Sequence, residues 1–153
     1  MRRPTKKKNK LTPDPVYGSV LVTKLTHYIM ERGKKETARR VIYAAMDELK
    51  KTGDPVAILD SAIKNIEPSL EVRSRRVGGA NYQVPMPVRP ERQLALALRW
   101  MRDAARSKKG VPMAKKLSEQ ILAASKGEGE AVAKRDNMHK MAEANKAFAH
   151  FAW

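Results

Sequence analysis

Apolar residues recur every three or four positions along most of the chain, and this period predicts amphipathic helices. The first run places Leu21, Leu25 and Tyr28 on one face. It follows the turn residues Gly18-Ser19, and Gly33 is expected to end it because glycine readily adopts the conformation that stops a helix. The chain is therefore expected to begin its folded part with a helix.

Two more helices are expected between residues 36 and 68. Gly53 separates them, and Asp54-Pro55 has the order of an N-cap residue followed by proline in the first turn. Pro68 is expected to end the second of these helices. Their apolar faces consist of Ala38, Ile42, Ala45 and Leu49 in the first and of Val56, Leu59, Ile63 and Ile66 in the second.

The period of the pattern shortens to two at residue 70, as expected for a strand. Gly78-Gly79 can take the positive φ angles of a tight turn, and Tyr82-Gln83-Val84 is again typical of an extended chain. Pro85 and Pro87 are two residues apart and lack N–H groups, so the edge that they share must be unpaired. The sequence therefore predicts a two-stranded β-hairpin at about residues 70–88.

The remaining sequence returns to the helical period. One helix is expected from Pro90 to Gly110, a second up to Gly127, and a third through Phe148. Their apolar positions are Leu94, Leu98, Met101 and Ala105, then Met113, Leu117, Ile121 and Ala124, then Met138, Met141, Asn145 and Phe148. The predicted fold is all-α, a single domain at residues 11–153 of about six helices, with a protruding hairpin between the third and the fourth helix.

The charge of the chain indicates an anionic partner. The sequence has 32 Lys and Arg against 16 Asp and Glu, a formal net charge of +16. Residues 1–10 hold six of these cations and no acid, and residues 70–110 hold ten cations and three acids. So large an excess repels itself in an isolated compact chain. Because no run of 18 apolar residues is present, nucleic acid is favoured over a membrane as the polyanion.

Residues 1–10 are expected to be a disordered basic tail, because this composition cannot form a core. Such a tail follows a phosphate backbone in many nucleic-acid-binding proteins, and the alternative is that it only keeps the chain soluble. Its cations are Arg2, Arg3, Lys6, Lys7, Lys8 and Lys10.

Arginines on the hairpin and on the fourth helix are the sharpest candidates for phosphate ligands. Guanidinium groups bond phosphate oxygens in pairs, and an isolated hairpin is barely stable in water without a partner. On the helix, residues seven apart share one face, and only Glu91 and Asp103 are acids nearby in sequence. The alternative for both groups is a solvated surface. The candidates are Arg73, Arg75 and Arg76 on the hairpin and Arg92, Arg99, Arg102 and Arg106 on the helix.

The aromatic residues near the C-terminus have two interpretations. They could stack on bases, as aromatic side chains do in single-strand binders, or they could anchor the core. The residues are Phe148, His150, Phe151 and Trp153.

No group of residues in the sequence points to catalysis. The chain has no Cys, which excludes disulfides and Cys-ligated metals. His27, His139 and His150 form no known catalytic or metal-binding motif, so no enzyme activity, metal or cofactor is expected. Two alternatives stay open: a DNA-binding regulator that reads with residues 90–110, and an RNA-acting enzyme. The first lacks a clear helix-turn-helix pair, and the second lacks clustered carboxylates.

Stretches along the whole sequence resemble the universal small-subunit ribosomal protein S-seven family in its bacterial or organellar form. The hairpin and the segment from Met141 to Phe148 are the most specific, whereas the N-terminal tail is similar only in composition. Family members often carry a hydroxyl residue at the position of Ala80 or Asn81, so no hydroxyl contact is inferred there. The matching stretches are Leu11-Thr-Pro-Asp-Pro-Val-Tyr-Gly-Ser19, Gly33-Lys-Lys35, Val72-Arg-Ser-Arg-Arg-Val-Gly-Gly79, Tyr82-Gln-Val-Pro85, Arg99-Trp100 and Met138-His-Lys-Met-Ala-Glu-Ala-Asn-Lys-Ala-Phe-Ala-His150.

The resemblance implies a structural constituent of the small ribosomal subunit, on a cytoplasmic or organellar ribosome. Such a protein binds the 3′ domain of small-subunit ribosomal RNA, nucleates assembly of the head, and contacts neighbouring proteins of the head and platform. The expected ribosomal RNA ligands are the basic residues named above together with Lys34 and Lys35. The residues expected to face messenger RNA and exit-site transfer RNA are Arg75, Arg76, Gly78, Gly79, Lys140 and Lys146.

Overall fold

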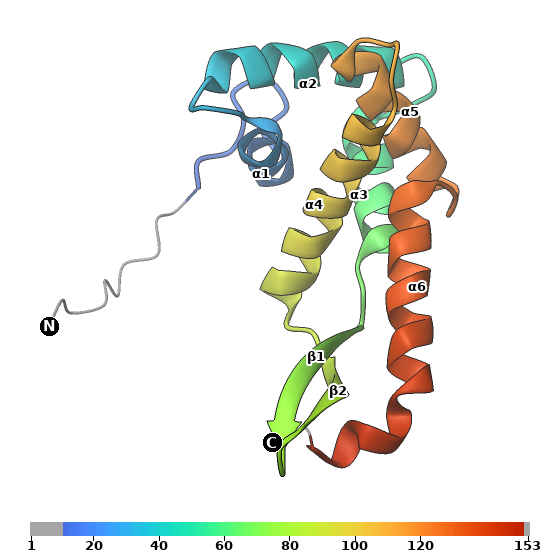
Figure 1. Ribbon diagram of the computed structural model, residues 1–153. Helices are drawn as coiled ribbons and strands as arrows, with labels where there is room; N and C mark the ends of the chain where they lie inside the picture. Colours follow the sequence, from blue (N-terminus) through green and yellow to red (C-terminus); the bar gives the residue numbers. More distant parts are fainter. Residues whose placement is uncertain (1–10, 152–153) are drawn as a thin grey trace, which may run out of the picture.

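A computed structural model describes residues 11–151, which form a helical body with a hairpin extending from one end (Figure 1). Within this range the chain has six α-helices, one 3-10 helix and one antiparallel pair of strands, so the predicted fold class is confirmed. In chain order the elements are α1 Val20–Ile29, α2 Lys35–Leu49, α3 Pro55–Ile66, β1 Leu70–Val77, β2 Ala80–Pro87, α4 Pro90–Ser107, α5 Met113–Ser125, α6 Glu130–Ala144 and the 3-10 helix η1 Lys146–Phe151.

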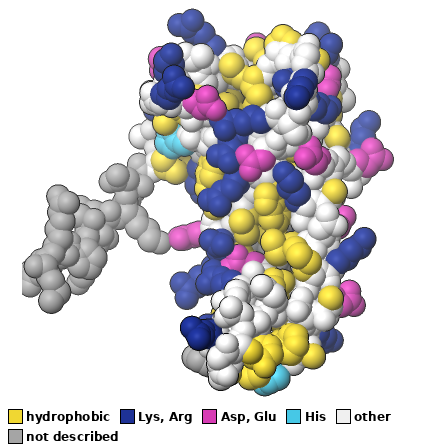
Figure 2. Space-filling view, in the orientation of Figure 1, with side chains coloured by type: hydrophobic (Ala, Val, Ile, Leu, Met, Phe, Trp, Pro, Cys, Tyr) yellow, Lys and Arg dark blue, Asp and Glu magenta, His cyan; other side chains and the backbone are white. Residues whose placement is uncertain are grey.

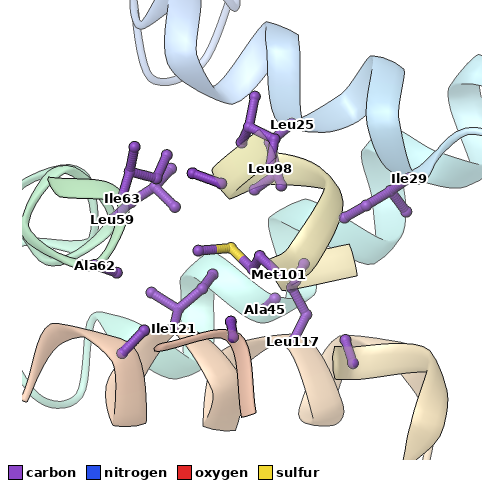
Figure 3. Close-up of a cluster of buried hydrophobic side chains, with 14 of the residues drawn as sticks. Leu25, Ile29, Ala45, Leu59, Ala62, Ile63, Leu98, Met101, Leu117 and Ile121 are labelled. Atoms are coloured by element: carbon purple, nitrogen blue, oxygen red, sulfur yellow. The ribbon is translucent and has the colours of Figure 1, made fainter. Parts of the chain in front are cut away.

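The core lies where α5 packs against α2, α3 and α4 (Figure 3). Met101 of α4 is fully buried, and Ala45, Leu59 and Ile121 surround it from three other helices. Most of the apolar positions expected from the helical period of the first five helices are buried, which confirms that these stripes form one shared core. Leu21, Tyr28, Val56, Leu94 and Met113 are only partly buried against it.

Side-chain caps fix the starts of two helices. The Asp54 side chain accepts a hydrogen bond from the Val56 N–H at 3.0 Å, as the order Asp-Pro predicts. Ser19 accepts one from the Leu21 N–H at 3.2 Å and so caps α1. Both caps satisfy backbone donors that would otherwise lack partners in the first turn.

Two helices end before the glycines that were expected to end them. α1 stops at Ile29 because Met30 is already extended, while its N–H bonds the Thr26 carbonyl at 2.9 Å. Gly33, with φ 75°, lies in the following turn that leads into α2. In the same way α4 ends at Ser107 and Lys108 is extended, so Gly110 lies in the connection to α5. These glycines take positive φ angles in the connections between helices and do not cap the helices.

The apolar pattern expected for the last helix is wrong. Met141 is 49% exposed, and the residues of α6 that are buried are Ala131, Val132 and Ala142. The α-helix also ends at Ala144, and the C-cap residue Asn145 donates its side-chain amide to the Met141 carbonyl at 2.8 Å. The reason is that α6 leaves the helical body and continues alongside the hairpin, where little of its surface meets a core (Figure 1).

The hairpin has the predicted range and turn. Val77 pairs with Ala80 across Gly78 and Gly79, whose φ angles are 57° and 90°. Two consecutive positive φ angles are the conformation of a type I′ turn, which matches the twist of the two strands. Farther down the ribbon Pro85 pairs with Val72, and among the described residues the sheet has only these two strands.

Candidate nucleic-acid interface

The hairpin is held against the C-terminal part of the chain by aromatic contacts. The Tyr82 ring lies 5.2 Å from the ring of Phe148 and 5.2 Å from that of Phe151, measured between centroids. The aromatic residues of η1 therefore anchor the hairpin and not the helical core, which is a third role beside the two that the sequence left open. Trp153 lies outside the described residues.

A histidine fixes the base of the hairpin to α6. His139 Nε2 accepts a hydrogen bond from the Ser69 N–H at 3.0 Å. Because this bond and the aromatic contacts are at opposite ends of the ribbon, they hold the hairpin along its length. The hairpin therefore has a partner within its own chain, as expected if it lies on its own domain. These contacts concern the position of the hairpin and not the ligands of its arginines.

The three hairpin arginines are divided between the two faces of the ribbon. Arg73 and Arg75 alternate with Arg76, so Arg76 points to the opposite face from the other two. Arg76 is exposed and pairs with Asn81 across the ribbon, while Arg75 is partly buried and pairs with Tyr82. The hairpin consequently presents cationic groups on both sides.

A buried acid links the base of the hairpin to the start of α4. The Glu71 side chain is only 6% exposed. Its Oε1 accepts from Arg73 Nε at 2.5 Å and also pairs with Arg73 Nη2, while its Oε2 accepts from Arg92 Nε at 2.6 Å. Two of the predicted phosphate ligands, far apart in sequence, are therefore held side by side by one carboxylate.

Two opposing effects act on the pKa of Glu71. Burial by itself raises this pKa, but the hydrogen bonds and charges of Arg92 and Arg73 outweigh burial, so the pKa lies below its ordinary value. A carboxyl with a lowered pKa stabilises the fold above its ordinary pKa, and this contribution is lost as the pH falls through the lowered value. The contact is therefore complete at neutral pH.

The arginine stripe on α4 is more neutralised than the sequence indicated. Arg102 pairs with Asp103 at 2.7 Å, and Arg106 pairs with Glu31 at 2.7 Å. The expectation that nearby acids are too few is wrong, because folding brings Glu31 and Glu71 to the stripe from distant segments. Arg99 is exposed, and no ion pair reaches it from residues 11–151.

The remaining lysines fall into two separate regions. Lys34 lies with Arg106 and Glu31 at a pocket of about 400 Å³ beside the start of α2, at the far end of α4 from the hairpin. Lys146 lines a second pocket together with Leu70 of the hairpin. Lys35 and Lys140 are exposed. The structure thus joins Lys146, but not Lys34, to the hairpin.

Sequence reasoning missed Arg89. This residue directly precedes Pro90 and lies with Arg73 and Arg92 around an open pocket of about 380 Å³ at the base of the hairpin. Figure 2 shows Lys and Arg side chains gathered at the lower left of this face, where the hairpin and the start of α4 lie. The high charge of residues 70–110 was the only signal in the sequence that included Arg89.

The remaining expectations concern the basic tail, a metal site and a membrane span. The tail lies outside the described residues, with its cations Arg2, Arg3, Lys6, Lys7, Lys8 and Lys10. Within residues 11–151, no three His, Asp or Glu side chains are placed to hold a metal ion. No helix in this range is both long and apolar enough to cross a membrane.

A helical body with a docked, arginine-bearing hairpin defines a basic protein of the nucleic-acid-binding class. Comparison with known proteins narrows this class. The family model of ribosomal protein S7p/S5e matches residues 1–146, and the chain belongs to this family. It is a structural ribosomal protein and not an enzyme, which removes both the DNA-binding regulator and the RNA-acting enzyme as alternatives.

Curated relatives support this assignment over the full length. The chain is 52% identical over 155 residues to the small ribosomal subunit protein uS7 of Fervidobacterium nodosum, with 100% of both chains covered. It is 54% identical over 145 residues to that of Dictyoglomus turgidum, covering 94% of this chain and 93% of the relative. The uS7 protein of Bifidobacterium longum is 51% identical over 154 residues, with 99% of each chain covered.

Proposed function

We propose that this chain is a structural protein of the small ribosomal subunit that binds the 3′ domain of the small-subunit ribosomal RNA and nucleates assembly of the head. The observation that carries the proposal is the rigidly held hairpin, which presents Arg73 and Arg76 on opposite faces. Because the RNA major groove is too narrow for side chains to read bases, recognition depends on RNA shape and backbone phosphates. A fixed set of guanidinium groups suits that task.

A second part of the proposal concerns the hairpin and the C-terminal segment. We propose that the hairpin tip and the lysines beside it face messenger RNA and exit-site transfer RNA. Lys140 is exposed on α6, and Lys146 lies at the pocket that η1 and α6 form with the hairpin. Gly78 and Gly79 at the tip have no side chains, so a nucleic acid backbone can approach them closely. Neighbouring head and platform proteins would complete this environment.

The binding test compares the 3′ domain RNA with an unrelated RNA of equal size across a salt series. If about eight phosphates are neutralised, the logarithm of the affinity should fall with the logarithm of salt with a slope of about −6 to −7. The 3′ domain RNA is expected to bind more tightly than the unrelated RNA at each salt concentration, although both affinities fall as salt rises. Equal binding of both RNAs across the salt series would contradict the proposal.

The variant that tests the hairpin is Arg75→Ala with Arg76→Ala. It should weaken binding to the 3′ domain RNA. The salt slope should also become less steep, by about one for each phosphate that is no longer bound. The matched control, Lys51→Ala with Lys126→Ala, removes two exposed cations outside the hairpin and should leave selectivity unchanged. Subunits reconstituted with the hairpin variant should also retain exit-site transfer RNA less well than subunits with the control.

A further inference from the structure

The pocket at the base of the hairpin has a composition that suits a single anion. Its volume is about 380 Å³, and it opens between the strands and the start of α4. Three of its lining side chains are guanidinium groups and one is a carboxylate, which leaves an excess of two positive charges. The lining residues are Glu71, Arg73, Met86, Pro87, Arg89 and Arg92.

We propose that this pocket binds one backbone phosphate of RNA, with Arg89 as a direct ligand and Glu71 as a positioning residue. Glu71 would act by holding Arg73 and Arg92 in the orientation that receives the phosphate. This inference rests on the proposed ribosomal RNA binding, and it identifies which part of the surface makes one of the contacts. It adds Arg89 to the ligands expected from the sequence, and it gives Glu71 a positioning role that the sequence did not suggest.

The hydrogen bonds of Glu71 leave donors for a ligand. Arg92 uses only its Nε at the carboxylate, so both of its terminal nitrogens stay available, and Arg73 keeps Nη1. The two side chains line the pocket and are 49% and 52% exposed, so a ligand in the pocket can reach them. A ligand that meets two arginines already held in place does not have to order them, which favours binding.

The positioning role of Glu71 can be tested by whether its substitution strengthens or weakens RNA binding. Glu71→Gln keeps the size of the side chain and raises the net charge by one, so a purely electrostatic account predicts tighter RNA binding. The positioning role predicts the opposite, a loss of about five- to tenfold, as expected when charge-assisted hydrogen bonds that orient two arginines are weakened. Glu128→Gln is the matched control, because Glu128 is exposed in the connection between α5 and α6.

A second variant tests the pocket without touching Glu71. Arg89 is exposed, and Arg89→Ala should weaken binding to the 3′ domain RNA and make the negative salt slope less steep by about one. Lys126→Ala is its control. Partial unfolding would lower the fraction of active protein without changing the slope, so the slope separates removal of a phosphate ligand from damage to the fold. Circular dichroism of each variant checks the fold, and Arg89→Ala carries the test should Glu71→Gln fail to fold.

The outcomes separate this inference from the proposed function. The pocket is overturned when Glu71→Gln binds as tightly as the unchanged chain or more tightly, or when Arg89→Ala leaves both affinity and slope unchanged. In that case selective binding of the 3′ domain RNA by the unchanged chain would still support the proposed function. Conversely, weaker binding by both variants, with equal binding to either RNA, would support a phosphate pocket and contradict the ribosomal RNA specificity.

Discussion

At the scale of single residues, buried acids organise distant parts of this chain. Asp14 is only 5% exposed, and its Oδ2 accepts hydrogen bonds from the backbone N–H groups of Val16 and Tyr17 at 3.1 and 3.2 Å. The Tyr43 hydroxyl of α2 donates to the same oxygen at 3.0 Å. Burial, followed by the bond to Asp14, raises the pKa of Tyr43, so this hydroxyl stays a donor at neutral pH. Asp14 therefore fastens the segment before α1 to α2.

Replacing this acid should measurably destabilise the protein. Asp14→Ala leaves three donors without their shared acceptor, and we expect the free energy of unfolding to fall by about 2–3 kcal/mol. Urea denaturation measures the loss. Asp60→Ala, at an exposed position on α3, should change stability by less than about 0.5 kcal/mol. Equal effects of the two substitutions would show that the Asp14 contacts do not contribute to stability.

At the scale of elements, the hairpin depends on the conformation of its turn. A Cβ atom added at Gly78 would meet no other atom within 4 Å, so an alanine there would have space. The backbone, with φ 57°, is nevertheless in the left-handed region that disfavours residues with a Cβ. The effect of a substitution at this position is therefore conformational and not steric.

Gly78→Ala should loosen the hairpin without unfolding the helical body. The left-handed conformation costs a residue with a Cβ about 1–2 kcal/mol, which corresponds to about five- to thirtyfold faster hydrogen exchange in β1 and β2. Amide exchange followed by mass spectrometry reports this change. Gly53→Ala is the control, because Gly53 has no positive φ and an added Cβ would make only an ordinary 3.7 Å contact with Ile58. Unchanged exchange in the hairpin would contradict the role given to the turn.

At the scale of the whole molecule, one core supports the hairpin and α4, which carry the candidate arginines. α5 contacts α2, α3, α4 and α6, and the strands follow directly from α3 and lead directly into α4. The position of the arginines thus depends on the packing of helices far from the hairpin. Met101 lies at the centre of this packing and is fully buried (Figure 3).

A cavity at Met101 should therefore affect global stability. Met101→Ala is expected to lower the free energy of unfolding by about 2–5 kcal/mol, since it removes buried contacts and leaves a void. Met141→Ala removes the same atoms from a side chain that is 49% exposed and should have an effect below about 0.5 kcal/mol. Thermal and urea unfolding of both variants give the comparison, and similar values would place the core elsewhere.

The sequence alone determined the order and approximate positions of the elements, and the charge that points to an anionic partner. The helical period located α2 and α3, and Asp54-Pro55 marked the start of α3 correctly. Gly78-Gly79 likewise predicted the hairpin turn. These features are local, because periodicity, capping and turn conformation depend on residues within a few positions of one another.

Only the tertiary structure decided which charges are paired and what holds the hairpin. Glu71 joins Arg73 to Arg92, and Glu31 reaches Arg106, across separations that no sequence spacing indicates. The C-terminal aromatic residues pack on Tyr82 because α6 runs alongside the strands, a direction set by packing on α4 and β1. Packing between segments distant in sequence fixes these contacts, so local patterns contain no information about them.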